Sequence, residues 1–93
     1  MTSDPFFRMT VADVFFIRGR GTVVTGQIEA GTLHVNDEVQ IDRPGAPRRT
    51  VVVAGIEMFR KILTEANAGD NVGVLLRDVQ KKDIAHGDLL IGS

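Results

Sequence analysis

The residues best suited to bind a ligand lie in the segment Glu57-Met58-Phe59-Arg60-Lys61. One carboxylate that accepts hydrogen bonds and two cations that donate them border a Met-Phe pair. An acceptor and a donor beside an apolar platform suit a ribose and a phosphate next to a stacked base. The same charges also suit an ordinary surface ion pair, which contributes about 0–1 kcal/mol to stability. The residues alone leave both interpretations open.

A second candidate is the glycine pattern at Gly19, Gly21 and Gly26. A dinucleotide fingerprint requires its third glycine three residues after the second, at the start of a helix, whereas strand-like residues follow Gly21 here. The Gly-Lys-Ser/Thr of a P-loop is absent from the chain. The pattern therefore predicts turn glycines, with a bulge or a close contact at Gly26, rather than nucleotide binding.

Catalytic and metal-binding groups are sparse. The chain has no cysteine, its only serines are Ser3 and Ser93, and its acidic residues are scattered. His34 alternates with apolar neighbours and is expected to face solvent, while His86 precedes a turn glycine, and neither has a second ligand at metal-binding spacing. We therefore predict no catalytic residues and no metal site, and the chain is not expected to be an enzyme.

Composition places the chain among ordinary soluble proteins. It has 93 residues and a formal net charge of −1, from 11 Lys and Arg against 12 Asp and Glu, and 43% of its residues are hydrophobic. This length fits a single domain, and the balanced charge argues against a large counterion-release term in nucleic-acid binding. No apolar run approaches the roughly 20 residues of a membrane helix, and residues 1–5 do not resemble a signal peptide. A cytoplasmic location is expected.

The pattern along the chain is typical of an all-β protein. Ten glycines and three prolines divide the sequence into short apolar or alternating runs rich in β-branched residues. A type II turn is expected at Pro44-Gly45, and one helical turn at 81–84. Short strands at this spacing favour a sandwich or a closed barrel. Strands are expected in the runs 14–17, 22–28, 33–35, 38–42, 50–56, 72–76 and 89–91.

The segment 57–67 conflicts with this pattern. Its apolar residues, from Met58 to Ala66, fall at helical spacing, which predicts a helix with Arg60 and Lys61 facing water. The alternative is a hairpin that turns at Arg60-Lys61 between two short strands. Periodicity by itself does not choose between them.

Three blocks of the chain resemble the second domain of elongation factor Tu and related translational GTPases. They are Gly19-Arg20-Gly21-Thr22-Val23-Val24-Thr25-Gly26 with the following Gln27–Gly31, Gly55–Lys61, and Ala68–Arg77. The resemblance runs in order over nearly the whole chain. It implies a closed six- to seven-stranded antiparallel β-barrel and a hairpin at Arg60-Lys61. It also implies that residues 1–93 are a single such domain, with the family's GTPase and third domains absent.

Residue by residue, the resemblance implies a site for the acceptor end of aminoacyl-tRNA. Glu57 would accept a hydrogen bond from the terminal ribose, whose 2′-hydroxyl distinguishes RNA from DNA, and Arg60 would approach a backbone phosphate. The remaining positions are the adenine-pocket walls Ile17, Val23 and Leu75, the aminoacyl-pocket lining Asp13, Phe15, Thr25 and Asn71, and a loop facing small-subunit ribosomal RNA, namely Arg18, Gly19, Arg20 and Gly21.

The implied partners are therefore aminoacyl-tRNA, ribosomal RNA and a GTPase domain in cis or in trans, with no membrane. No cofactor is expected in this domain, because GTP and Mg²⁺ belong to the family's separate GTPase domain. One departure is Ala12-Asp13, where the family usually has two consecutive acidic residues. The missing carboxylate and the neutral charge also fit an alternative, a protein-interaction or structural module that keeps the fold without binding tRNA.

Overall fold

The computed structural model describes residues 6–92. Residues 1–5, where no signal peptide was expected, and Ser93 lie outside this range. Within it, no helix is long and apolar enough to span a membrane. The elements are β1 (Arg8–Thr10), β2 (Asp13–Ile17), β3 (Gly21–Ala30), β4 (Thr32–His34), β5 (Glu38–Asp42), β6 (Arg49–Met58), β7 (Lys61–Leu63), β8 (Glu65–Asn67), β9 (Asn71–Arg77), the 3₁₀ turn η1 (Lys81–Asp83) and β10 (Leu89–Ile91).

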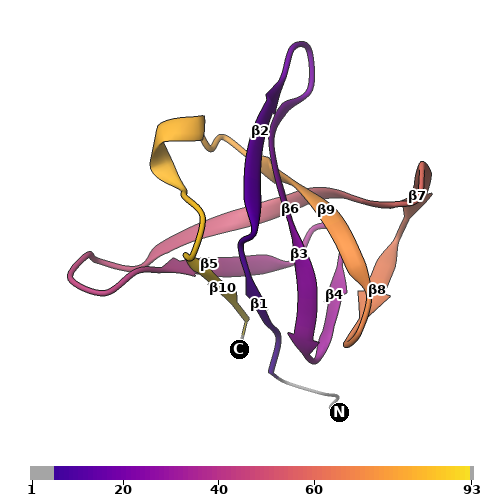
Figure 1. The fold of residues 1–93 in the computed structure, drawn as a ribbon, viewed down its shortest axis with the longest axis horizontal. Helices are drawn as coiled ribbons and strands as arrows, with labels where there is room; N and C mark the ends of the chain where they lie inside the picture. Colours follow the sequence, from indigo (N-terminus) through magenta and orange to yellow (C-terminus); the bar gives the residue numbers. More distant parts are fainter. Residues whose placement is uncertain (1–5, 93) are drawn as a thin grey trace.

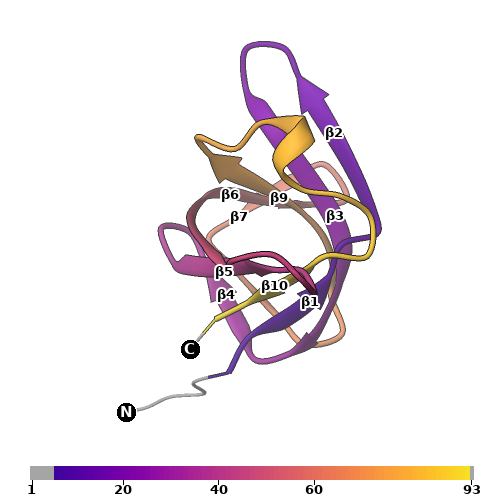
Figure 2. The ribbon, with the colours of Figure 1, turned by 90° about the vertical axis from the view of Figure 1, so that its left-hand side faces the viewer.

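Six of these strands form a closed antiparallel barrel (Figures 1 and 2). They follow the order β1-β10-β5-β6-β9-β3, and β3 pairs again with β1, which closes the ring. β2 extends the sheet beside β3 as a projecting hairpin, β7 pairs with the end of β6, and β4 and β8 form a separate ribbon. Closure leaves the six barrel strands without a free edge, because each pairs with a neighbouring strand on both sides. The expected barrel is confirmed.

Alternation of side chains separates the core of the barrel from its outer face. Val24, Val74 and Ile56 lie directly opposite one another on β3, β9 and β6, and all three are fully buried. Successive residues of a strand point to opposite sides of the sheet, so the residues flanking these three face outward. The same three strands thus build the core and one surface, and the strand register decides which side chains share that surface.

The segment 57–67 is a hairpin, and its helical spacing is misleading. β6 continues to Met58, which pairs with Lys61, and the two residues between them, Phe59 and Arg60, have φ angles of 51° and 66°. The turn therefore lies at Phe59-Arg60, one residue before the predicted Arg60-Lys61. A two-residue turn with positive φ at both positions matches the twist of the two strands that it joins. Phe59 and Ile62 are 83% and 82% exposed, so the apolar residues do not form one buried face.

The other expected elements are found with small shifts. All seven predicted strand runs overlap observed strands, and η1 occupies the predicted helical turn at Lys81–Asp83. Gly45 has φ 81°, and Ala46 N–H donates to the Arg43 carbonyl at 3.1 Å, as a turn centred on Pro44-Gly45 requires. β1 and β8 were not predicted, since each is three residues long with one buried side chain.

Thr22, the buried hydroxyl residue of β3, provides a test of the core. It is fully buried, and its Oγ1 donates to the Val79 carbonyl at 2.5 Å. Thr22→Val keeps the shape and β-branching but removes the donor, so we expect the free energy of unfolding to fall by about 1–3 kcal/mol. Urea denaturation measures this change. Thr50→Val, at an exposed position of β6, should change stability by less than about 0.5 kcal/mol, and equal losses in the two variants would contradict the assignment.

Candidate functional site

Strand register brings the predicted residues of four strands onto one outer face, formed by β2, β3, β9 and β6. The pairing fixes two rows of outward positions across these strands. A one-residue slip of any strand would turn its predicted residues into the core. The rows are Phe15–Val23–Leu75–Gly55 and Asp13–Thr25–Gly73–Glu57.

A hollow of about 440 Å³ lies on this face, and we call it the β3–β9 hollow. Ala12 and Phe59 also border it, so the position that departs from the family pattern and the exposed tip of the β6–β7 hairpin both belong to its rim. Its lining combines apolar, amide, hydroxyl and charged groups, as a site for a nucleoside would require. Five predicted residues line it: Val23, Thr25, Glu57, Arg60 and Asn71.

A second hollow of about 520 Å³, the β9 hollow, lies beside the first. Leu75, Arg20 and Gly21 line it together with Arg77. Val23 of the first hollow and Leu75 of the second lie directly opposite each other on neighbouring strands, so the two hollows adjoin. Two of the three predicted adenine walls, Val23 and Leu75, therefore lie along the boundary between them.

Glycines beside Val23 and Leu75 leave the boundary between the two hollows open to solvent. A Cβ at Gly73 would lie 3.4 Å from Val23 Cγ1, and Cβ atoms at Gly21 and Gly55 would lie 3.6 and 3.7 Å from Leu75 side-chain atoms. Because these positions carry no side chain, Val23 and Leu75 stay partly accessible from outside the barrel. The result is an apolar notch with charged residues at its edges.

Glu57 forms an ion pair that the sequence did not indicate. Its Oε2 contacts the Nη2 of Arg20, which belongs to the turn between β2 and β3. The surface pair considered from the sequence, between Glu57 and Arg60 or Lys61, is not found among residues 6–92. Arg20 lies in the β2–β3 turn and Glu57 lies on β6, and β9 separates β3 from β6 in the sheet. Spacing along the sequence therefore could not have indicated their contact.

Several predicted residues lie on the same face but outside both hollows. Asp13 and Phe15 are on β2, beyond β3, and Ile17 is 39% exposed at the end of β2, next to the turn of the projecting β2–β3 hairpin. Arg18 and Gly19 occupy the turn of that hairpin, where Gly19 has φ 83°. The geometry thus gathers the predicted ribose and phosphate positions with two of the adenine walls, Val23 and Leu75, and leaves the predicted positions on β2 outside the hollows.

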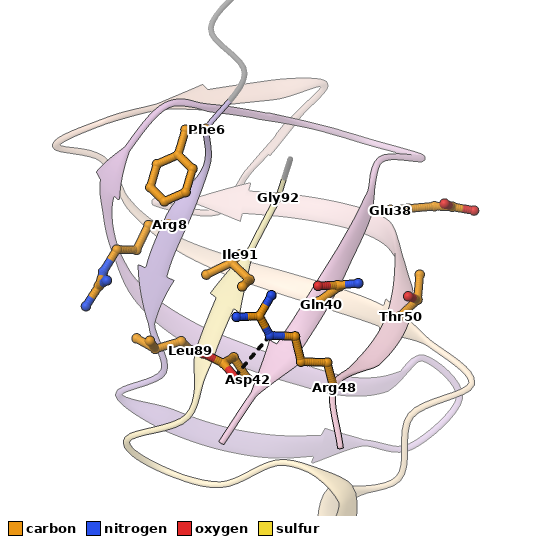
Figure 3. Close-up of a pocket in the computed structure, with 10 residues that line it drawn as sticks. All are labelled: Phe6, Arg8, Glu38, Gln40, Asp42, Arg48, Thr50, Leu89, Ile91 and Gly92. Carbon is orange, nitrogen blue, oxygen red and sulfur yellow. Dashed lines mark hydrogen bonds and ion pairs between the residues drawn. The ribbon is translucent and has the colours of Figure 1, made fainter. Parts of the chain in front are cut away.

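A further hollow of about 520 Å³ lies across the barrel, on the outer face of β1, β10, β5 and β6 (Figure 3). It contains none of the predicted site residues. Its cations are already paired, since Arg48 Nε lies 3.4 Å from Asp42 Oδ1 and Arg8 Nε lies 2.8 Å from Glu29 Oε1. The favoured site is therefore on the β3–β9 side.

The histidines and acidic residues of the described chain offer no metal centre. His34 is exposed as expected, with Nδ1 3.6 Å from Asp37 Oδ2 and Nε2 3.4 Å from Glu65 Oε1. Among residues 6–92, no group of three or more His, Cys, Asp or Glu side chains is arranged to hold a metal ion.

The fold and the site together define an all-β domain: a closed antiparallel barrel with a polar-edged apolar notch on its outer face. A family model described as elongation factor Tu domain 2 matches residues 21–91. The chain is also 54% identical over 87 residues to "Elongation factor Tu, apicoplast" of Plasmodium falciparum (isolate 3D7), a match that covers 91% of this chain and 21% of the relative. The chain therefore belongs to the elongation factor Tu domain 2 family, and it spans about a fifth of that relative's length.

Proposed function

We propose that this barrel binds the acceptor end of an aminoacyl-tRNA as one part of a translation elongation factor, with a GTPase domain as its partner. The observation that carries the proposal is the convergence of Val23, Glu57, Arg60 and Asn71 on one hollow from separate strands and a turn. Each contributes a group that a terminal adenosine and its linkages require: an apolar surface, a hydrogen-bond acceptor, a cation and an amide.

The proposed roles follow from these groups. The Glu57 carboxylate accepts the ribose 2′-hydroxyl, the Arg60 guanidinium contacts a phosphate, and the adenine lies against Val23 and Leu75. Asn71 and Thr25 line the β3–β9 hollow, which Ala12 also borders, and the aminoacyl group is proposed to lie against them. The projecting β2–β3 turn, Arg18–Gly21, is proposed to contact small-subunit ribosomal RNA.

Glu57→Ala and Arg60→Ala test the proposal in a full-length elongation factor that contains this barrel. We expect each substitution to weaken aminoacyl-tRNA binding by about 1–3 kcal/mol, because each removes a charge-assisted contact. Filter binding measures the dissociation constants. Arg48→Ala, which removes an exposed cation across the barrel, is the control and should change affinity little. Equal affinities for the wild type, Glu57→Ala and Arg60→Ala would refute the assignment.

A spectroscopic test on the 93-residue chain addresses the alternative of a protein-interaction module. Titration with an aminoacyl-adenosine fragment, followed by NMR, should shift the amide signals of Glu57, Arg60 and Leu75. Shifts confined to these positions support RNA binding by the barrel. No shift at millimolar ligand would instead favour a module that keeps the fold without the binding activity.

A further inference from the structure

We propose that Arg20 is a positioning residue for Glu57: its guanidinium holds the carboxylate at the border of the two hollows, so that one carboxylate oxygen faces the ribose. This inference rests on the proposed function, because it assigns Glu57 to the 2′-hydroxyl. It concerns a residue that the resemblance places only in the ribosome-facing loop.

The contact links two parts of the site that the strands hold apart. Arg20 belongs to the projecting β2–β3 turn and lines the β9 hollow, whereas Glu57 lies on β6 and lines the β3–β9 hollow. Their ion pair spans β9, the strand between β3 and β6. Gly73, which lies directly opposite Glu57 on β9, has no side chain to crowd the carboxylate.

The ion pair uses only half of the acceptor capacity of the carboxylate. Arg20 Nη2 contacts Oε2, and within the part of the chain that the structure describes no other side chain forms an ion pair or hydrogen bond with Oε1. A carboxylate has acceptor sites on both oxygens. Oε1 is therefore available for a hydroxyl donor, while the contact at Oε2 limits the rotation of the side chain.

The Arg20–Glu57 ion pair is expected to contribute little to the free energy of unfolding. The side chains of Arg20 and Glu57 are 43% and 38% exposed, and ion pairs at such positions stabilise a fold weakly. Fixing a flexible side chain before binding does, however, reduce the entropy lost when the ligand binds, an effect of about three- to tenfold in affinity for one side chain. Variants of Arg20 should consequently fold normally and lose affinity selectively.

The experiment measures discrimination for the 2′-hydroxyl rather than affinity alone. The 93-residue chain is titrated with 3′-deoxy-3′-(phenylalanylamino)adenosine and with its analogue lacking the 2′-hydroxyl, and NMR gives both dissociation constants. We expect the wild type to prefer the hydroxyl compound by about tenfold or more, as for a hydrogen bond to a charged group. Arg20→Ala should reduce this preference to about threefold or less, with an unchanged fold by NMR.

Two further variants separate positioning from general electrostatics. Arg77→Ala removes another cation of the β9 hollow, one without an ion-pair partner among the described residues, and should keep the wild-type preference. Arg20→Lys should give an intermediate preference, since an ammonium keeps the charge but not the planar donor array. In a Glu57→Ala background, Arg20→Ala should have no further effect on the preference.

The outcomes distinguish this inference from the proposed function. If the wild type prefers the hydroxyl compound and Arg20→Ala keeps the full preference, Arg20 does not position Glu57, although the proposed function survives. If Arg20→Ala and Arg77→Ala lost the preference for the 2′-hydroxyl compound equally, the inference would also be overturned, because the loss of a positive charge alone would then explain the effect. If the wild type binds both compounds equally, the role of Glu57 fails, and the role of Arg20 fails with it.

Discussion

Gly26→Ala should lower the free energy of unfolding by about 3 kcal/mol or more, which is a large part of the stability of a small domain. Gly26 lies on β3 where this strand passes β1. A Cβ at this position would collide with the Thr10 carbonyl oxygen and would lie 3.3 Å from Met9 Cγ. Because the Thr10 oxygen belongs to the backbone of β1, β1 must move away from β3 to relieve the collision. The close contact that the sequence predicted at Gly26 is thus confirmed.

Urea denaturation or thermal unfolding of the purified chain measures this effect, and a loss of about 3 kcal/mol corresponds to a fall in Tm of about 12 °C or more. Gly55→Ala is the matched control on β6. Its Cβ would lie at an ordinary 3.7 Å from Leu75 Cβ, so its stability should stay within about 1 kcal/mol of the wild type. A Gly26→Ala protein as stable as the Gly55→Ala protein would show that β1 and β3 are not so close.

Asp88→Asn should lower stability at neutral pH by about 1.5–3 kcal/mol, because it weakens charge-assisted hydrogen bonds at a buried position. Asp88 is only 5% exposed. Its carboxylate accepts hydrogen bonds from Arg43 Nε and Nη2 at 2.9 and 2.7 Å and from the Ala85 backbone N–H at 2.9 Å. These contacts join the loop before β10 to the end of β5, so they hold together one part of the barrel wall.

The pH dependence of this loss has a definite sign. The Arg43 guanidinium and, after it, the Ala85 N–H lower the pKa of the Asp88 carboxyl, while its burial opposes them. A carboxyl whose pKa is lower in the folded state contributes stability above its unfolded pKa of about 3.9, and this contribution is lost as the pH falls through the folded pKa. The difference between the wild type and Asp88→Asn should therefore be largest near pH 7 and shrink below about pH 4.

Chemical denaturation between pH 2 and pH 7 tests this expectation. The pKa values of Glu29 and Asp83 are also lowered, by contacts with Thr10 and Arg8 and by the Gln80 N–H and Arg49, so the wild type alone would show their combined effects. Subtracting the free energy of unfolding of Asp88→Asn from that of the wild type at each pH isolates the contribution of the Asp88 carboxylate. Asp42→Asn, at an exposed pair with Arg48, should change stability by less than about 1 kcal/mol at pH 7. A difference between the wild type and Asp88→Asn that stays constant down to pH 2 would contradict the assigned role of the Arg43 contact.

Much of the fold was predictable because the long strands carry their own signal. Val23, Val24 and Thr25 are β-branched and alternate between the two sides of β3, and the run at β9 repeats this alternation. β1 carries no such signal: its central Met9 is fully buried only because Leu90 and Ile28 lie opposite it on two other strands. Local periodicity cannot report burial that distant segments supply.

The β6–β7 hairpin shows how local pattern can mislead. The apolar residues between Met58 and Ala66 have the spacing of a helix, yet Phe59 and Ile62 stay exposed. The resemblance, not the periodicity, supported the hairpin, and the turn itself moved to Phe59-Arg60 because the strand pairing of Met58 with Lys61 requires it. A short segment has too few contacts of its own to decide between a helix and a hairpin.

For the candidate site, the types of its groups were evident in the sequence, but their neighbours were not. The Glu57-Met58-Phe59-Arg60 segment already contains an acceptor, an apolar surface and a cation, whatever the chain around it does. Only the closed barrel places Val23 and Asn71 in the same hollow, puts Asp13 and Phe15 beyond its rim, and joins Glu57 to Arg20 instead of Arg60. The physical reason is that side-chain chemistry is a property of each residue, whereas proximity across strands depends on the register of backbone hydrogen bonds between segments far apart in the chain.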